Sequence, residues 1–159
     1  MILILLFKSD DTNLEIVIDP QVFKNIFEEC SKWENLETGG ILIGAYFDNR
    51  AIISEMTGPP RDSIHEPANF YRGIVGVQQL LDEKYKQGER LVGEWHYHPN
   101  NSPEPSKIDD ATMHEFSQDE KLNCSEIISI IAGGNSCMGW ELSVHIYMNN
   151  QKYKFKQQN

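Results

Sequence analysis

Residues 94–99 read Glu-Trp-His-Tyr-His-Pro, and this stretch decides how the rest of the chain can be arranged. Its composition predicts a strand, in which alternate side chains point to the same face of a sheet. His96 and His98 are therefore expected on one face. Pro99 has no N–H to donate to a neighbouring strand, so the strand is expected to end there.

A helix start follows a few residues later. Residues 106–109 read Ser-Lys-Ile-Asp, and a serine followed three positions later by an acid is typical of a capped helix N-terminus. Asp109 would then lie in the first turn of the helix, beside the end of the strand. Two imidazoles and one carboxylate that converge form a ligand set for Zn²⁺ with a fourth position open for water. Taken alone, each of the two patterns has a plainer interpretation. The histidines could be paired surface side chains, and the acid could serve only to cap the helix.

The composition indicates one soluble globular domain over residues 1–159, with 40% hydrophobic and 24% charged residues. The formal net charge is −10. Nucleic-acid binding requires clustered lysines and arginines that neutralise phosphates, so this charge argues against it. It argues equally against binding to an anionic membrane surface.

The cysteines and the first residues bear on the compartment. Cys30, Cys124 and Cys137 form no Cys-x-x-Cys pair, which is typical of free thiols in a reducing cytosol. The apolar residues 1–7 lack the basic flank and the cleavage site of a signal peptide. They are predicted to form a buried first strand, and we expect a cytoplasmic protein.

The remaining periodicities predict an α/β (α+β) domain in which a mixed sheet is flanked by about three helices. Asp19 is expected to cap a helix that begins at Pro20, and further helices are expected over 74–85 and 106–117. The inward side of the last helix is expected to carry Ile108, Ala111 and Phe116. Strands are expected over residues 14–18, 41–44, 50–56, 90–98, 126–132, 140–148 and 152–155, with residues 57–69 forming a long exposed loop.

A second motif lies upstream of the histidines, where residues 37–44 read Glu-Thr-Gly-Gly-Ile-Leu-Ile-Gly. Together with His-x-His-Pro, six residues, and Ser-x-x-Asp, it resembles the JAMM metallopeptidases, the MPN-plus group of JAB domains. The resemblance covers residues 37–109 and implies an MPN/JAB fold, which is cytidine-deaminase-like. The matching positions are Glu37, Gly39, Gly40, Leu42, Gly44, His96, His98, Pro99, Ser106 and Asp109.

The resemblance also implies roles for these residues. His96, His98 and Asp109 would hold one Zn²⁺ per chain, with water as its fourth ligand. Glu37 would act as general base toward that water and then deliver the proton to the leaving amine. Ser106 would donate a hydrogen bond to the oxyanion. The plainer interpretation of Glu37 is a solvated acid before a strand.

Two further hypotheses concern the surroundings of the site. Glu94 lies two residues before His96 and is expected on the same face, where it would hydrogen-bond a ligand imidazole, unless it is an exposed acid at the strand end. The loop with Arg61 and His65, and Tyr71 beyond it, is a candidate wall that grips an extended peptide by strand addition. The alternative is an ordinary mobile loop.

Members of the resembled family cleave after the C-terminus of ubiquitin or ubiquitin-like proteins. Relatives specialised for ubiquitin chains carry a longer segment after the metal-binding aspartate than residues 118–125 provide here. The chain is thus more similar to stand-alone bacterial members, some of which act in anti-phage CBASS operons, where they release a conjugated nucleotidyltransferase. The expected partner is a protein with an extended C-terminal tail, ubiquitin-like or conjugated.

Three alternatives remain open from the sequence. A peptidase could trim the C-terminal tail of a sulfur-carrier protein. A metal-free MPN scaffold is disfavoured because such proteins typically lack a histidine or the aspartate, and both kinds of residue are present here. A deaminase-like zinc hydrolase is disfavoured because Cys124 and Cys137 lack the Pro-Cys-x-x-Cys arrangement.

Overall fold

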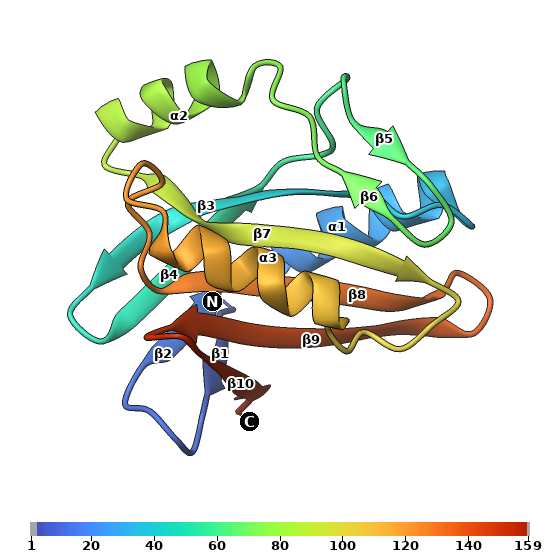
Figure 1. The fold of residues 1–159 in the computed structure, drawn as a ribbon. Helices are drawn as coiled ribbons and strands as arrows, with labels where there is room; N and C mark the ends of the chain where they lie inside the picture. Colours follow the sequence, from blue (N-terminus) through green and yellow to red (C-terminus); the bar gives the residue numbers. More distant parts are fainter. Residues whose placement is uncertain (1–2, 159) are drawn as a thin grey trace.

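A strongly curled mixed sheet forms the body of the protein in the computed structural model, which describes residues 3–158 (Figure 1). The sheet is made by β1 (Leu5–Lys8), β2 (Glu15–Ile18), β3 (Gly39–Phe47), β4 (Arg50–Met56), β7 (Arg90–Pro99), β8 (Ile127–Asn135), β9 (Gly139–Met148) and β10 (Gln151–Gln157). The helices are α1 (Pro20–Trp33), α2 (Val77–Lys86) and α3 (Lys107–Gln118). A separate two-stranded ribbon is made by β5 (Ile64–His65) and β6 (Phe70–Tyr71).

The strand order explains why β7 is central. The order is β2-β4-β3-β7-β8-β9-β10-β1, and β1 also pairs with β2, so the sheet curls back on itself. The pairs β2/β4 and β7/β8 are parallel and the others are antiparallel. A parallel pair needs a long crossover connection, and α3 forms the one between β7 and β8. The expected mixed sheet with three helices is confirmed.

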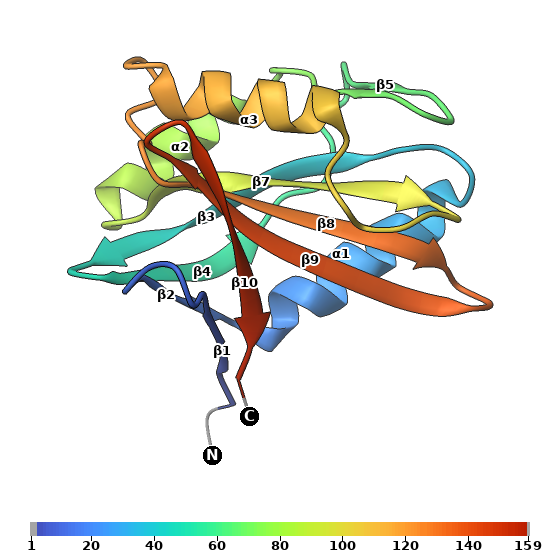
Figure 2. The same ribbon diagram turned by 60° about the horizontal axis from the view of Figure 1, so that its bottom comes forward.

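Side-chain alternation along β7 separates the core from the site. Trp95 and Tyr97 are buried in the core cluster to which α1 contributes. His96 lies between these two residues and His98 follows them, so both histidines point to the opposite face. That face is covered by α3, which contacts β8 and β9; Figure 2 shows α1 and α3 on opposite sides of these strands.

The predicted start of α1 is confirmed, and a tight turn joins β9 to β10. Asp19 caps α1 by accepting a hydrogen bond from the Gln21 N–H at 2.9 Å, and Pro20 is the first helical residue. The stripe Val22, Phe23, Ile26 and Cys30 is buried. Asn149 and Asn150, between β9 and β10, both have positive φ angles of 52° and 60°, as expected for a tight hairpin turn.

The first strand is shorter than expected. Pairing begins at Leu5, which lies opposite Ile18, whereas Leu3 and Ile4 are 66% and 59% exposed. The prediction of a buried strand over residues 1–7 is therefore wrong at residues 3–4, because pairing to β2 starts only after them. Residues 1–2 lie outside the described part of the chain.

Two helices also depart from expectation. The second begins at Val77 rather than at residue 74, because Gly76 has a left-handed φ of 80° and the Asp62 carboxylate binds the N–H groups of Ile74 and Val75. In α3, Ile108 and Ala111 are exposed, and the buried residue is Met113. The helix is rotated so that its acidic first turn faces the sheet, which leaves Ile108 on the solvent side. Phe116 is half-buried against Met113 and its neighbours, as expected.

The region 57–69 is more ordered than an exposed loop. It contains β5, which pairs with β6 so that His65 lies opposite Phe70.

β3 begins at Gly39 rather than at Ile41. A Cβ on Gly40 would lie 2.0 Å from the Thr57 carbonyl oxygen, so the backbone at Gly40 passes too close to Thr57 for any other residue. No helix within residues 3–158 is long and apolar enough to cross a membrane.

Candidate metal centre

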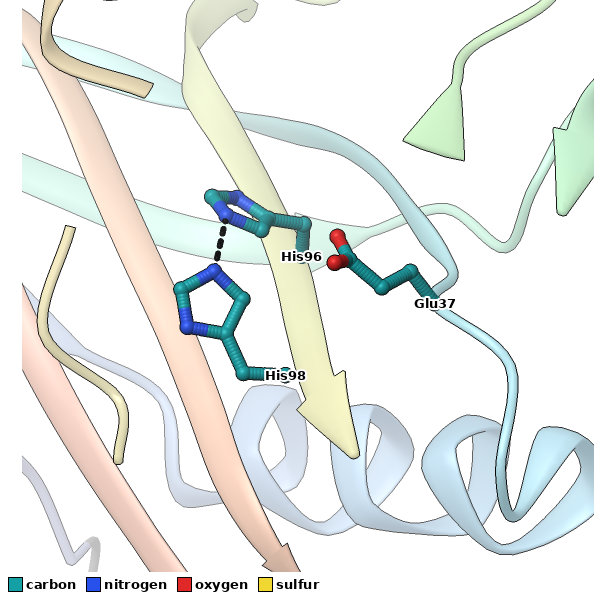
Figure 3. A group of neighbouring side chains, drawn as sticks. All are labelled: Glu37, His96 and His98. Carbon is teal, nitrogen blue, oxygen red and sulfur yellow. Dashed lines mark hydrogen bonds between the residues drawn. The ribbon is translucent and has the colours of Figure 1, made fainter. Parts of the chain in front are cut away.

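The two histidines of β7 meet at the end of the strand. Their Nε2 atoms are 3.0 Å apart, and their side chains are 18% and 14% exposed. Figure 3 shows both rings projecting from the same face of β7, with the Glu37 carboxylate beside them. The arrangement follows from strand alternation, as the sequence predicts.

Asp109 reaches both rings from the first turn of α3. One carboxylate oxygen is 3.3 Å from His96 Nε2 and the other is 3.2 Å from His98 Nε2. Ligand atoms bound to one tetrahedral zinc are about 3.4 Å from each other, given metal–ligand distances near 2.0–2.2 Å. The separations of these three groups therefore fit a single ion.

A reciprocal capping box aims Asp109. The Ser106 hydroxyl oxygen accepts a hydrogen bond from the Asp109 N–H at 3.1 Å, and the Asp109 carboxylate accepts one from the Ser106 N–H at 2.8 Å. This box fixes the direction of the first turn. Because the Ser106 oxygen acts as acceptor here, its hydroxyl proton stays available for another partner.

The ring of His98 is held in one tautomer. Its Nδ1 lies 3.0 Å from the Ser102 carbonyl oxygen, which can only accept, so Nδ1 carries the proton. The Nε2 lone pair is then directed at the centre, as a metal ligand requires. The carbonyl that does this belongs to the loop between β7 and α3.

Strands β8 and β9 each hold that loop through a hydrogen bond. The Asn101 carbonyl accepts from the Gly134 N–H at 3.0 Å, and the Pro103 carbonyl accepts from the buried Ser143 hydroxyl at 2.6 Å. A Cβ on Gly133 would lie 2.4 Å from the Asn101 oxygen. The role of Ser143 has no signal in the sequence, because it follows only from the register of β9 beside the loop.

Glu37 approaches the centre from a different part of the chain. It lies in the short segment between α1 and β3, and its carboxylate and the two imidazoles place one ligand atom each within 4.8 Å of one another. Two carboxylates thus face the histidine pair. Asp109 is in direct contact with the rings, whereas no hydrogen bond or ion pair joins the Glu37 carboxylate to them among the described residues.

The electrostatics of the centre follow from burial and from the neighbouring charges. Burial raises the pKa of Glu37, so this acid holds a proton more readily than an exposed glutamate. Burial opposes the charge on Asp109 as well, but the hydrogen bonds that His96 and His98 donate in their protonated forms outweigh it and lower its pKa. Burial acts to lower the pKa of His98, but the hydrogen bonds to Asp109 and Ser102 have the larger effect. The pKa of His98 is therefore raised.

Glu94 lies on the histidine face, as expected, but binds a different group. Its carboxylate pairs with the Arg72 guanidinium, and the two side chains are 17% and 23% exposed. Arg72 also donates to the Gly73 carbonyl at 2.9 Å. The contact seen for Glu94 is thus an ion pair that fastens the end of the β5–β6 ribbon to β7, not a hydrogen bond to an imidazole.

The three residues suggested for a substrate wall have different positions. Arg61 is exposed. Tyr71 is 56% exposed and lies opposite Ile64, which is 57% exposed. His65 points inward, and its Nδ1 lies 2.9 Å from the Glu37 carbonyl oxygen. The structure therefore brings His65 to the backbone of the site, whereas Tyr71 stays on the outer surface.

The profile of the family described as prokaryotic homologs of the JAB domain matches residues 19–143. The chain belongs to this JAB-domain family. The match runs from α1 through β8 into β9 and includes the crossover helix and every residue of the centre described above, and it confirms the resemblance found in the sequence.

Relatives of this JAB-domain protein carry the names of peptide-bond and isopeptide-bond hydrolases. It is 38% identical over 142 residues to a "CD-NTase/cGAS isopeptidase" of Enterobacter hormaechei, covering 88% of this chain and 79% of the relative. It is 28% identical over 124 residues to a "probable metalloprotease" of Sinorhizobium fredii, covering 75% and 76% of the two chains. A second "CD-NTase/cGAS isopeptidase", from Escherichia coli, is 27% identical over 108 residues, 66% of this chain and 69% of the relative. These names support a metal-dependent hydrolase of the isopeptidase type.

A solved structure supports the fold alone. The solution structure of a Desulfitobacterium hafniense protein, DSY2949, superposes with a TM-score of 0.61 at 12% identity, covering 89% of this chain and 88% of that one. The curled mixed sheet and its helices are thus shared beyond recognisable sequence similarity.

Proposed function

We propose that this JAB-domain protein is a zinc-dependent isopeptidase that hydrolyses the bond after the C-terminal tail of a ubiquitin-like or conjugated protein. One observation carries the proposal. His96, His98 and Asp109 converge at 3.0–3.3 Å, the geometry of a three-ligand catalytic zinc site, and a second carboxylate, Glu37, lies beside them. A purely structural zinc site would have a fourth protein ligand instead.

His96 Nε2, His98 Nε2 and one oxygen of Asp109 would hold the ion. When bound, Zn²⁺ polarises the scissile carbonyl and lowers the pKa of water so that hydroxide is available at neutral pH. Glu37 takes the proton from the attacking water and delivers it to the leaving amine. Its raised pKa suits this shuttle, because the acid must hold the proton between the two steps.

Ser106 would stabilise the oxyanion of the tetrahedral intermediate. Its oxygen is committed to the Asp109 N–H, so its O–H is the group that donates toward the substrate. An exposed hydroxyl at the mouth of the centre can do this without desolvating a further charge.

The substrate class rests on the named relatives and on the outer ribbon surface. Relatives named as CD-NTase/cGAS isopeptidases support an isopeptide bond that joins a nucleotidyltransferase to another protein, and with it a role in antiviral defence. Ile64 and Tyr71, with Arg61 nearby in sequence, form the candidate wall for the tail. The protein would act in the reducing cytoplasm, in keeping with its free cysteines Cys30, Cys124 and Cys137.

The proposal is tested by metal content and cleavage measured together. Purified wild type is expected to bind about one zinc per chain and to cleave a ubiquitin-like fusion or a conjugated nucleotidyltransferase. Asp109→Asn keeps an oxygen for the helix cap but loses the anionic ligand, so zinc and cleavage are both expected to fall. Glu115→Gln, an exposed acid on the same helix, is the matched control. A wild type without zinc in metal-replete buffer would refute the proposal, and cleavage only of a sulfur-carrier precursor would reassign the substrate.

A further inference from the structure

The backbone of Glu37 is held on both sides by the β5–β6 ribbon. Its N–H donates to the Glu66 carbonyl at 2.9 Å, and its carbonyl accepts from the His65 ring at 2.9 Å. Residues 34–38 belong to neither helix nor strand. At residue 37 itself the ribbon therefore supplies both backbone hydrogen bonds, while Tyr97 of β7 holds the flanking residues Glu34 and Thr38.

The His65 ring is fixed in its own place by aromatic neighbours. It stacks on Trp33 with a centroid distance of 3.4 Å and an interplanar angle of 10°, and it lies 5.1 Å from the Phe70 ring. Trp33 is the last residue of α1. The ring thus connects the end of α1, the ribbon and Glu37. Because the Glu37 carbonyl oxygen can only accept a hydrogen bond, Nδ1 of His65 carries the proton.

Strand alternation divides the ribbon into two layers. Ile64 and Tyr71 form its exposed outer pair, whereas His65 and Phe70 form the inner pair. Phe70 packs so close to the start of β3 that a Cβ on Gly39 would lie 3.0 Å from its ring. The inner pair therefore rests directly on the strand that Glu37 precedes.

The carboxylate of Glu37 depends on this support. Among residues 3–158, no side chain hydrogen-bonds the carboxylate itself. Its position near the imidazoles is thus determined by the backbone at residue 37 and by packing. A general base must stay within hydrogen-bonding reach of its water, and a displacement of about 1 Å can cost on the order of a hundredfold in rate.

We propose that His65 is a positioning residue that holds Glu37 in its catalytic place through the Nδ1–H···O=C hydrogen bond. The inference rests on the proposed role of Glu37 as general base. His65 touches neither the metal ligands nor the reacting atoms, and Trp33 keeps its ring in the orientation that the hydrogen bond requires.

Three variants test the inference. His65→Phe keeps an aromatic ring on Trp33 and removes the donor, His65→Asn restores a donor near the position of Nδ1, and Ala68→Ser at the exposed ribbon turn is the matched control. For His65→Phe we expect kcat to fall about ten- to a hundredfold, with KM within twofold of wild type and zinc content unchanged. His65→Asn should recover most of kcat. Unchanged kcat in His65→Phe, a loss confined to KM or zinc content, or no recovery in His65→Asn would overturn the inference.

A crystal structure of His65→Phe gives a readout that does not depend on activity. We expect its Glu37 carboxylate to move away from the imidazole pair, with the Ala68→Ser structure unchanged. An unmoved carboxylate would overturn the inference. If the wild type binds zinc but cleaves no protein, the proposed function fails, and this structural comparison still decides whether His65 positions Glu37.

Discussion

The Nδ1 atom of His98 lies 3.0 Å from the carbonyl oxygen of Ser102, so the orientation of a candidate metal ligand depends on the loop that follows it. That loop is in turn held by Ser143 through the Pro103 carbonyl. Partners of this kind, one shell out from the metal, typically affect metal affinity ten- to a hundredfold.

Ser143→Ala is therefore expected to weaken zinc binding about tenfold, because the loop loses its buried donor and Ser102 no longer holds the ring. Competition with a chromophoric chelator measures the affinity. Ser125→Ala, which alters an exposed hydroxyl outside the loop, serves as control. Equal affinities in Ser143→Ala and wild type would show that the loop keeps its shape without this bond.

Glu37→Gln is expected to keep the zinc and to lose at least a hundredfold in kcat, since an amide cannot accept the proton of water at neutral pH. Steady-state cleavage and metal analysis on the same preparation check both statements. A variant that loses zinc together with activity would instead make Glu37 a metal ligand, which its position within 4.8 Å of the imidazoles also permits.

The exposed pair Ile64 and Tyr71 is expected to contact the substrate tail. Replacing both by serine should raise KM about thirtyfold with little change in kcat, because each lost apolar contact removes roughly a kcal/mol of binding that is present throughout the reaction. Phe47→Ser, which removes an apolar side chain that is 60% exposed on β3, should leave KM unchanged. A fall in kcat at constant KM would place the pair in the catalytic step rather than in binding.

The Arg72–Glu94 ion pair is expected to stabilise the ribbon against β7. Arg72→Met leaves a half-buried carboxylate without its partner and should cost about 2 kcal/mol of unfolding free energy. The double variant Arg72→Met/Glu94→Gln should recover part of that loss, because the unpaired charge is gone. Denaturant titration measures both values, and additive losses in the double variant would contradict the pairing.

His145 is expected to make stability pH-dependent. It is 2% exposed, and burial, followed by the charge of Lys152, lowers its pKa to about 4. The unfolded chain takes up this proton near pH 6.5 and the folded chain only near 4. Stability is therefore complete above the unfolded pKa and falls as the pH drops through this window, by up to about 3 kcal/mol.

His145→Gln should flatten this pH dependence in thermal unfolding of the zinc-free protein. The charged groups whose fields act on the ring are Lys152, Glu104, Lys154 and Asp110, and all are retained in the variant. An identical slope between pH 4 and 6.5 in the two proteins would show that another group controls acid stability.

Sequence patterns correctly predicted those features of the fold that depend on neighbouring residues. The cap of α1 and the common face of His96 and His98 each depend on residues within a few positions of one another. The convergence of Asp109 with the histidines was also predictable, because a capping box fixes the direction of the first turn. The resemblance to JAMM proteins placed Glu37 near this centre, which spacing alone did not.

The misses involve partners that are distant in sequence. Whether Leu3 and Ile4 are buried depends on where β2 ends, and which side of α3 faces the sheet depends on Tyr147 and Asp110, which are hydrogen-bonded at 2.6 Å. The inward turn of His65 depends on Trp33, at the far end of another element. Such contacts follow from register and packing, for which a single sequence carries no periodic signal.

The whole predicted ligand set lies in one strand-loop-helix unit, with His96 and His98 in β7 and Asp109 in α3. Glu37 enters from a separate stretch of chain whose placement requires α1 and the ribbon. Under the proposed function, metal binding and proton transfer thus depend on different segments of the chain, and damage to one need not affect the other. If Glu37 acts only as the general base, a variant with a disordered 34–38 segment is expected to bind zinc and substrate without cleaving the substrate.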